Sequence, residues 1–318
     1  MKRRHFLGSA AALLPGAAIA AGEQAKVPAQ TTTPTPADGP APLLRFGLIA
    51  DAQYADADPE GERHYRSTPE KMKRAVETIR AAKPAFTLHL GDFIDREFKS
   101  FDTMLPLINE LGHPVYHLLG NHDYTVADAE KARVVATMGM PHDYYTFRTG
   151  TGNIRIVMLD TNSLSTYKHP KESPATVAAA ARLKEAEAAG QSGAKPWNGG
   201  VSDPQLEWLD RELSAADVAK ERVILCGHHP LMPADMHTLW NTEAVLAVID
   251  KHPCVVAWFN GHNHAGDFAE RKGIPYVTFR SMLHHPENTA FSIVDVHADR
   301  IVVTGHGREV TRTLKISV

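Results

Sequence analysis

Five short clusters of carboxylate, amide and imidazole side chains recur along the 318-residue chain, each directly after a hydrophobic run typical of a buried strand. In chain order they are Asp51-Ala52-Gln53, Gly91-Asp92-Phe93-Ile94-Asp95, Gly120-Asn121-His122-Asp123, Gly227-His228-His229 and Gly261-His262-Asn263-His264. Ligands delivered from several strand ends converge at one edge of a sheet, which is where open α/β sheets place their sites. Carboxylate, amide and imidazole ligands without thiolates favour divalent metals such as Mn, Fe or Zn. The pattern therefore indicates a hydrolytic site with two metal ions.

Each cluster taken alone has a simpler interpretation. Asp51 and Asp92 are also typical turn or cap residues, and Gly120-Asn121 is an ordinary turn pair. The two histidines of the last cluster need not act together. The joint occurrence of metal-binding groups at all five strand ends, rather than any single cluster, favours the metal site.

Apolar periodicity outlines alternating strands and helices after residue 43. The runs that precede the five clusters are residues 44–50, 85–90, 115–119, 222–226 and 254–260. Helices are expected at residues 68–82, 98–111, 174–189, 202–213 and 240–251, with a Gly-rich loop at 191–200. A strand at 153–160 has Ile154, Ile156 and Met158 on one face and Val157 and Leu159 on the other, so both faces should be covered. Because further strands at 276–280, 291–296 and 301–305 end the chain, we predict an α/β fold of two stacked mixed sheets flanked by helices.

The first 20 residues resemble a twin-arginine signal peptide, although Lys2 stands where that motif usually has Ser or Thr. A basic start, Lys2-Arg3-Arg4, is followed by a short apolar stretch and a small-residue cleavage site at Ala18-Ile19-Ala20. An uncleaved membrane anchor is disfavoured, because the apolar run falls short of about 20 residues and Pro15 interrupts it. We expect export by the twin-arginine machinery to the periplasm or the extracellular space, with no stable membrane span. Residues 21–42 are typical of a Pro-, Thr- and Ala-rich disordered linker, so the folded domain should occupy residues 43–318.

Composition argues against some other functions. The net charge of −3 at pH 7 provides no basic surface for nucleic acid. The two cysteines, Cys226 and Cys254, both fall in expected core strands, which favours two buried thiols over a disulfide. A side-chain nucleophile is not indicated either, since the chain has no Gly-x-Ser-x-Gly elbow and Ser163 and Ser165 lack a paired base.

The five clusters resemble the motifs of the calcineurin-like metallophosphoesterases, which run Asp-x-His, Gly-Asp-x-x-Asp, Gly-Asn-His-Asp/Glu, Gly-His and Gly-His-x-His. Gln53 departs from this pattern, since most members have His there. With that Gln and the stretch Trp197-Asn198-Gly199-Gly200, the chain resembles the narrower group of manganese-dependent ADP-ribose/CDP-alcohol diphosphatases. The resemblance covers most of residues 43–312. It implies a four-layer αββα sandwich of two mixed β-sheets flanked by helices.

The resemblance also implies two adjacent divalent metal ions, Mn²⁺ above all, with Fe or Zn as alternatives. Asp51, Gln53 and His264 would hold one ion, Asn121, His228 and His262 would hold the other, and Asp92 would bridge both. The neutral oxygen of Gln53 in place of an imidazole makes the first site harder, which favours Mn over Zn. His229, in contrast, is expected to pack or form hydrogen bonds nearby.

His122 and Asp95 have separate roles in this pattern. His122 would not bind metal but would face the phosphate, where it stabilises charge or protonates the leaving oxygen. Asp95 would hydrogen-bond the other ring nitrogen and fix the tautomer, and the alternative for Asp95 is a helix N-cap. The nucleophile would be a metal-bridging hydroxide.

The implied substrate is a nucleotide-containing small molecule such as ADP-ribose or a CDP-alcohol, cleaved at its phosphoanhydride. Candidates for stacking on the base are Tyr54, Tyr124 and Trp197, with Tyr65 and Trp240 as further aromatics near the motifs, although core packing is the alternative for each. Candidates for the distal phosphate are Arg66, Arg96 and His285. Two alternatives stay open: a broad phosphomonoesterase or cyclic-nucleotide phosphodiesterase with the same metals, and a catalytically dead metal-binding protein, which the paired His122 and Asp95 argue against.

Overall fold

The computed structural model describes residues 40–316 of the chain. The signal-like residues 1–20 and the linker up to residue 39 lie outside the described residues. Among residues 40–316, no helix combines the length and the apolar character that a membrane span requires.

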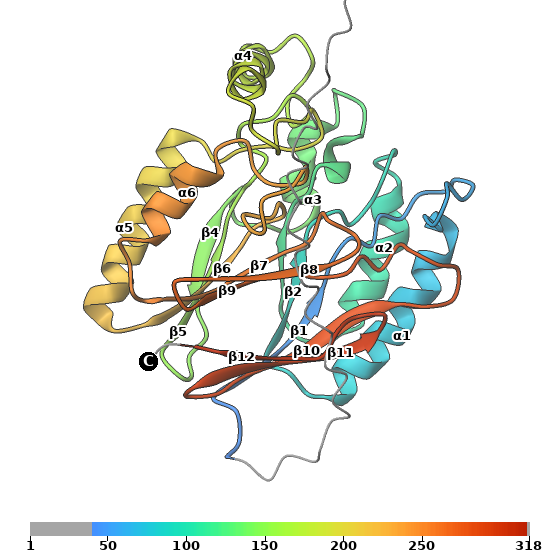
Figure 1. Ribbon diagram of the computed structural model, residues 1–318. Helices are drawn as coiled ribbons and strands as arrows, with labels where there is room; N and C mark the ends of the chain where they lie inside the picture. The colour runs from blue at the N-terminus through green and yellow to red at the C-terminus, as the bar shows by residue number, and fades with distance from the viewer. Residues whose placement is uncertain (1–39, 317–318) are drawn as a thin grey trace, which may run out of the picture. The chain divides into compact units, whose positions relative to one another are not determined.

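Two six-stranded sheets form the centre of the domain (Figure 1). Sheet one has the order β12 (Arg312–Lys315), β11 (Arg300–Gly307), β10 (Ala290–Val296), β1 (Leu44–Ile49), β2 (Phe86–Leu90) and β3 (Val115–Leu118). Sheet two has the order β4 (Tyr145–Arg148), β5 (Ile154–Met158), β6 (Arg222–Cys226), β7 (Val255–Asn260), β9 (Ile274–Thr278) and β8 (Asp267–Arg271). In each sheet a parallel group, β1-β2-β3 and β5-β6-β7-β9, is extended by antiparallel strands. Both sheets are therefore mixed, as predicted.

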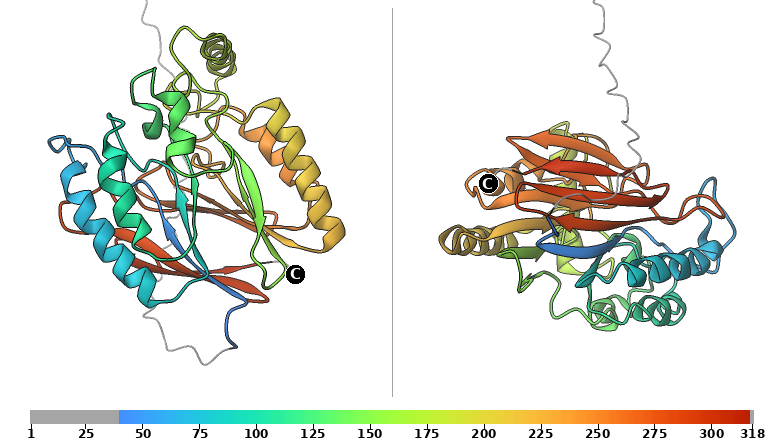
Figure 2. Two further views of the ribbon diagram at one scale, coloured as in Figure 1. Left: turned by 180° about the vertical axis from the view of Figure 1, so that it is seen from behind. Right: turned by 90° about the horizontal axis from the view of Figure 1, so that it is seen from below.

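Helices cover the outer face of each sheet (Figure 2). Helices α1 (Thr68–Ala81) and α2 (Ser100–Asn109) pack together beside sheet one, and α5 (Asp203–Ala219) and α6 (Thr242–Ile249) pack together beside sheet two. The connections contain α3 (Val134–Thr137), α4 (Pro174–Ala188) and the 3₁₀ turns η1 (Tyr65–Ser67), η2 (His122–Tyr124) and η3 (Lys131–Arg133). The predicted four-layer αββα sandwich is confirmed.

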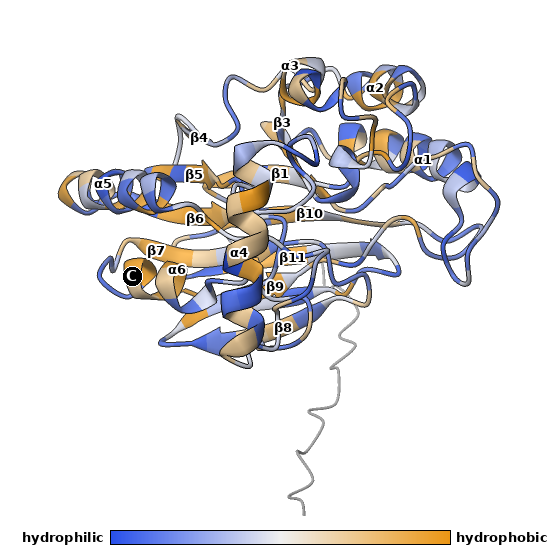
Figure 3. Cartoon of the chain, turned by 90° about the horizontal axis from the view of Figure 1, so that it is seen from above, coloured by the Kyte–Doolittle hydropathy of each residue, from blue (hydrophilic) through white to orange (hydrophobic). Residues whose placement is uncertain are grey.

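Alternation of apolar residues on β5 explains how sheet two is covered on both faces. Ile156 and Met158 belong to the core between the sheets, whereas Val157 belongs to the core under the helices, with Leu209 and Leu213 of α5. The central strands β5, β6 and β7 are accordingly hydrophobic along most of their length (Figure 3). Cys226 and Cys254 are buried free thiols, as expected.

Some boundaries differ from the predicted ones. Helix α5 continues beyond residue 213 to Ala219, because Ala216 extends its buried face, and it ends where Lys220 adopts a left-handed φ of 54°. Strands β4, β8 and β12 were not predicted. They lie at or near sheet edges and are half exposed, so they lack the apolar runs that mark central strands.

Two histidines lie opposite each other inside sheet one, His89 on β2 and His117 on β3. Both are buried, and neither ring nitrogen of His89 nor Nδ1 of His117 has a hydrogen-bond partner among the described residues. Burial lowers the pKa of His117 to about 4 and holds the pKa of His89 well below its usual value. Both imidazoles are therefore neutral in the folded protein at pH values where they would be charged in the unfolded chain.

We therefore expect the folded protein to lose stability on acidification, and His117→Leu to reduce that loss. Between pH 6.5, the usual histidine pKa, and about 4, the unfolded chain takes up a proton that folded His117 does not, so the free energy of unfolding falls as the pH falls. At pH 5 this effect amounts to about 2 kcal/mol for His117. Urea unfolding of the metal-free protein measures the free energy of unfolding at pH 8 and at pH 5. The difference between His117→Leu and wild type in this free energy should shift in favour of the variant by about this amount from pH 8 to pH 5. The exposed His142→Leu is the matched control, and a His117→Leu difference independent of pH would contradict the assignment.

Candidate metal centre

The five clusters converge where strands of both sheets end. Asp51 follows β1, Asp92 follows β2 and Asn121 follows β3 in sheet one, while His228 follows β6 and His262 follows β7 in sheet two. The convergence predicted from the sequence is thus observed, and the side chains meet across the two sheets rather than along one of them.

Sharp backbone turns aim these side chains inward. Asp51, Gln53, Asp92 and His262 have φ values of 51°, 44°, 55° and 69°, a left-handed region that non-glycine residues seldom adopt. Such conformations cost of order 1–3 kcal/mol each and persist where the surrounding structure requires them, typically at functional sites.

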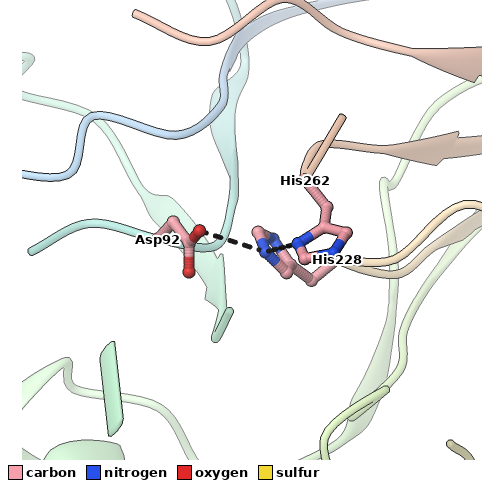
Figure 4. Close-up of side chains that lie close together, drawn as sticks. All are labelled: Asp92, His228 and His262. Carbon is pink, nitrogen blue, oxygen red and sulfur yellow. Dashed lines mark hydrogen bonds and ion pairs between the residues drawn. The ribbon is translucent and has the colours of Figure 1, made fainter. Parts of the chain in front are cut away.

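One group of donor atoms surrounds Nε2 of His228. This nitrogen lies 3.3 Å from Oδ2 of Asp92 and 3.2 Å from Nδ1 of His262 (Figure 4). It also lies 3.2 Å from Oδ1 of Asn121. Asn121, His228 and His262 are called the Asn121 group below. Electron-rich atoms packed this closely in a buried site need a proton or a cation between them.

A second group lies on the other side of Asp92. Nε2 of His264 lies 3.6 Å from Oδ1 of Asp51 and 2.9 Å from the amide nitrogen of Gln53, which also lies 2.7 Å from Oδ2 of Asp92. The Gln53 Oε1 atom is buried and has no partner among the described residues. Asp51, Gln53 and His264 are called the Gln53 group. In each group the carboxylate and imidazole donors, with Asp92 common to both, lie within 4.8 Å of one another.

The remote nitrogens of the Asn121-group histidines are occupied, so their other nitrogens are left for a ligand. Nδ1 of His228 donates to the carbonyl of Leu90 at 2.8 Å, and Nε2 of His262 donates to Oδ1 of Asn198 at 2.7 Å. This arrangement fixes the tautomer of a metal-binding imidazole and its orientation. Together with the unpartnered Gln53 oxygen, it fits two divalent ions of oxygen and nitrogen preference.

The electrostatics of the buried centre also call for added positive charge. Burial raises the pKa of Asp51 to about 7, although His228 acts in the opposite direction. Burial alone would lower the pKa of His228, but Asp92 raises it to about 9. A proton on His228 therefore compensates the buried carboxylates in the metal-free protein, and a divalent cation would replace it.

His122 lies at the edge of this centre on η2. Its backbone N–H donates to Oδ1 of Asp92 at 2.8 Å, and Nδ1 of its ring lies 3.0 Å from Oδ1 of Asp95, an ion-pair distance without the alignment of a straight hydrogen bond. Burial lowers the pKa of His122, but the carboxylates of Asp92 and Asp95 outweigh it and raise the pKa overall. Asp95 is not a helix cap, because the N-cap of α2 is Lys99. The imidazole borders the centre without joining either donor group.

Comparisons with known proteins agree with this geometry. The calcineurin-like phosphoesterase family matches residues 44–266. This chain belongs to that family. The phosphoesterase is 32% identical over 298 residues to the manganese-dependent ADP-ribose/CDP-alcohol diphosphatase of Arabidopsis thaliana, a match that covers 84% of this chain and 95% of that protein. It is 29% identical over 310 residues to the human protein of the same name, with 84% of this chain and 91% of that protein covered. The crystal structure of a dimetal phosphatase from Danio rerio superposes with a TM-score of 0.78 at 27% identity, covering 87% of this chain and 100% of that one. The family resemblance predicted from the motifs is confirmed.

Asp123 supports the phosphoesterase centre in a way that sequence reasoning missed. Its carboxylate accepts from the backbone N–H of Asp92 at 2.9 Å, of Phe93 at 2.8 Å, of Ile94 at 3.1 Å and of Gly120 at 2.9 Å. It thus ties the loop after β2 to the loop after β3. Its place as the last residue of Gly120-Asn121-His122-Asp123 was the available signal.

Asn198 is a second missed residue, although its stretch was recognised. Its amide nitrogen donates to the carbonyls of Gly193 at 2.8 Å, Met236 at 2.8 Å and Thr238 at 3.2 Å, which leaves Oδ1 to accept from His262. The fully buried Asn198 therefore links a loop to the His262 ring of the Asn121 group and fixes the orientation of that ring.

We expect Asn198→Ala to weaken metal binding by the Asn121 group about 10- to 100-fold, the usual effect of losing such a supporting hydrogen bond. Without Oδ1, the His262 ring loses both its tautomer control and its fixed orientation. Titration of the metal-free protein with Mn²⁺ measures the change. Asn109→Ala, at an exposed asparagine, is the control, and unchanged affinity in Asn198→Ala would contradict this role.

His229 keeps out of the centre, as expected. Its Nδ1 lies 2.8 Å from the hydroxyl of Thr161, and its ring packs against those of His228 and His262, with centroid distances of 5.1 and 4.3 Å. This packing supports the two imidazole rings of the Asn121 group.

A cleft of about 670 Å³ opens onto the centre. Trp197, which is 40% exposed, lines it beside the Asn121 group. Tyr54 and Tyr124 do not line it. Tyr124 is only 2% exposed and belongs to the main core, and Tyr54 packs against that core, so the structure favours core packing, the alternative, over base stacking for both. The turn of η2 that brings His122 to the centre points Tyr124 into the protein.

The cationic residue of the cleft is Arg63, which sequence reasoning missed. Arg66 pairs instead with Asp56 and Asp58, and Arg96 pairs with Glu60, and neither arginine lines the cleft. Arg63 lines it beside the Gln53 group and forms no ion pair with a described carboxylate. Its guanidinium group is therefore available to an anion in the cleft.

Proposed function

We propose that this phosphoesterase is a manganese-dependent diphosphatase that hydrolyses the phosphoanhydride of nucleoside diphosphate conjugates, such as ADP-ribose and CDP-alcohols. The observation that carries the proposal is the pair of donor groups that share Asp92 at the floor of a cleft of about 670 Å³. Relatives of this name match over most of their length. The cleft also has room for both halves of such a conjugate.

The donor groups have distinct roles in this proposal. Asp51, Gln53 and His264 would hold one ion, Asn121, His228 and His262 would hold the other, and Asp92 would contribute to both sites. When bound, the two cations neutralise phosphate charge and make water a stronger nucleophile. The neutral Gln53 oxygen makes its group harder than an imidazole would, which supports Mn²⁺ in preference to Zn²⁺.

The remaining side chains act on the substrate. His122 hydrogen-bonds the phosphoryl oxygens and donates the proton that the leaving oxygen needs, while Asp95 holds its ring. Arg63, at the Gln53-group end of the cleft, binds the phosphate that is not attacked. Trp197, at the Asn121-group end, offers an exposed aromatic face to the base. A substrate with two phosphates and a base would contact all three.

The test is turnover with Mn²⁺ on four compounds: ADP-ribose, CDP-choline, cyclic AMP and p-nitrophenyl phosphate. We expect the two diphosphate conjugates to be hydrolysed with the highest kcat/KM and to yield a nucleoside monophosphate. A wide preference for p-nitrophenyl phosphate or cyclic AMP would favour the broad phosphomonoesterase or phosphodiesterase instead. Mn²⁺ binding without turnover of any compound would indicate a catalytically dead metal-binding protein.

We also propose that residues 1–20 direct export by the twin-arginine machinery, to the periplasm or the extracellular space, with residues 21–42 as a linker to the domain. The support is the Lys2-Arg3-Arg4 start with the Ala18-Ile19-Ala20 cleavage site. Changing Arg3 and Arg4 to Lys is expected to stop the appearance of the exported form in cell fractionation. An exported form that persists in this variant would contradict the proposal.

A further inference from the structure

The segment of residues 281–284, which follows β9, contacts two members of the Gln53 group. The Ser281 hydroxyl and the Leu283 N–H both donate to the backbone oxygen of Asp51, at 2.9 and 3.1 Å. The Ser281 N–H donates to the backbone oxygen of His264 at 3.2 Å. This segment therefore fixes the backbone on both sides of the Gln53 group.

The last residue of the segment, His284, also orients a ligand ring. Its Nδ1 lies 3.3 Å from the Glu62 carboxylate, which can only accept a hydrogen bond, so in the neutral ring its Nε2 is an acceptor. Nδ1 of His264 lies 2.8 Å from this Nε2 and donates to it. The remaining nitrogen of His264 then has its lone pair directed at Asp51 and Gln53. The position of His284 thus controls the ligand atom of His264.

The carbonyls of the segment are held by Lys71 of helix α1. The side chain of Lys71 is completely buried, and Nζ donates to the backbone oxygens of Met282 at 3.1 Å, Leu283 at 2.8 Å and His284 at 3.3 Å. No described carboxylate pairs with it. An ammonium group has three N–H donors, so these three carbonyls satisfy all of them. Burying an amine is costly unless each donor is used, which makes this contact specific.

The Asn121 group has no comparable link to Lys71. His228 is held by the carbonyl of Leu90, and His262 is held by Asn198. Neither support involves residues 281–284. A disturbance of Lys71 should therefore reach one donor group and spare the other.

We propose that Lys71 is a positioning residue for the metal ion of the Gln53 group alone, acting through residues 281–284 and His284. The inference rests on the proposed function, because it assumes that each of the two donor groups binds a metal ion. Without the Lys71 ammonium the carbonyls of Met282 and His284 lose this donor, while that of Leu283 keeps the His64 N–H at 3.2 Å. The segment then holds His284, the partner that directs the lone pair of His264, less firmly. The loss of such outer support costs about 10- to 100-fold in metal affinity.

The experiment is titration of the metal-free full chain with Mn²⁺ alone, in which electron paramagnetic resonance measures the concentration of the free ion. Wild type is expected to bind two Mn²⁺ per chain. In Lys71→Met, which keeps the length of the side chain without its donors, one Mn²⁺ should bind about 10- to 100-fold more weakly while the other keeps its wild-type Kd. Lys73→Met, at an exposed lysine of the same helix, should bind both ions as wild type does.

A second variant keeps the proposal testable if Lys71→Met is insoluble. His284→Ala removes the same link from its other end and should weaken the same single ion, and the double variant should lose no more than either single change, because both act through one contact. Equal weakening of the binding of both ions would indicate a purely structural role and would overturn the inference. Wild-type binding of both ions in both single variants would also overturn it. A wild-type protein that binds no Mn²⁺ would instead refute the proposed function itself.

Discussion

Replacing Asp92 with asparagine is expected to abolish turnover together with the binding of both metal ions. Asp92 is the one carboxylate common to the two donor groups, because its Oδ2 lies 2.7 Å from the amide nitrogen of Gln53 and 3.3 Å from Nε2 of His228. Its Oδ1 accepts from the backbone N–H of His122. The amide removes a negative charge from between two cations. Because bound metals contribute several kcal/mol to transition-state stabilisation, kcat/KM should fall about 10,000-fold.

Metal analysis of the purified variant, beside kinetics in excess Mn²⁺, measures this effect. The matched control is Asp295→Asn on β10, a carboxylate that pairs with Arg45. It should keep two ions per chain and wild-type turnover. An Asp92→Asn protein that still held two tightly bound ions would contradict the bridging role, whatever its activity.

The His122→Asn variant is expected to separate catalysis from metal binding. His122 lies beside the centre with its Nδ1 against Asp95, and it belongs to neither donor group. Loss of a positioned proton donor typically costs about 100- to 10,000-fold in rate, so kcat should fall by that factor while the metal content stays near two per chain. Asp95→Asn should lower kcat in the same direction by a smaller factor, because the His122 ring stays in place and loses only the carboxylate that orients it and raises its pKa.

The measurement is kcat on ADP-ribose and CDP-choline with metal content determined on the same preparation. His142→Asn, at an exposed histidine that does not line the cleft, is the control and should behave as wild type. Full activity in His122→Asn would overturn its catalytic assignment, and loss of metal in this variant would make it a ligand instead. Either result leaves the roles of the two donor groups intact.

The centre was predictable because each cluster of donor residues comes soon after the end of a strand. A strand end is marked by the change from apolar to polar residues, and parallel strands place their ends together, so the sequence alone indicates that Asp51 and Asp92 converge. His262 follows a strand of the other sheet, and only the stacking of the two sheets brings it to them. The inter-sheet and helix-facing sides of β5 were predictable for a similar reason, since residues alternate across a strand.

The supports of the centre were not predictable, because they depend on the path of loops. Asn198 lies in a Gly-rich stretch with no periodicity, and only the fold brings it to His262. Arg63 and Tyr124 illustrate the same difficulty, because the direction of a side chain in an irregular turn is not encoded by spacing. Lys71 would pass in sequence for an ordinary surface lysine of an amphipathic helix.

The proposed metal ligands are divided between the two halves of the sandwich. Strands β1, β2 and β3 carry three of the loops that hold them, and β6 and β7 carry the others. Ions bound there would cross-link the first 80 or so residues of the domain to a region more than 100 residues later in the chain. Because an ion that binds only the native state stabilises it by mass action, cofactor supply and resistance to unfolding are coupled in this protein. Chelation would therefore loosen the joint between the sheets as well as stop catalysis.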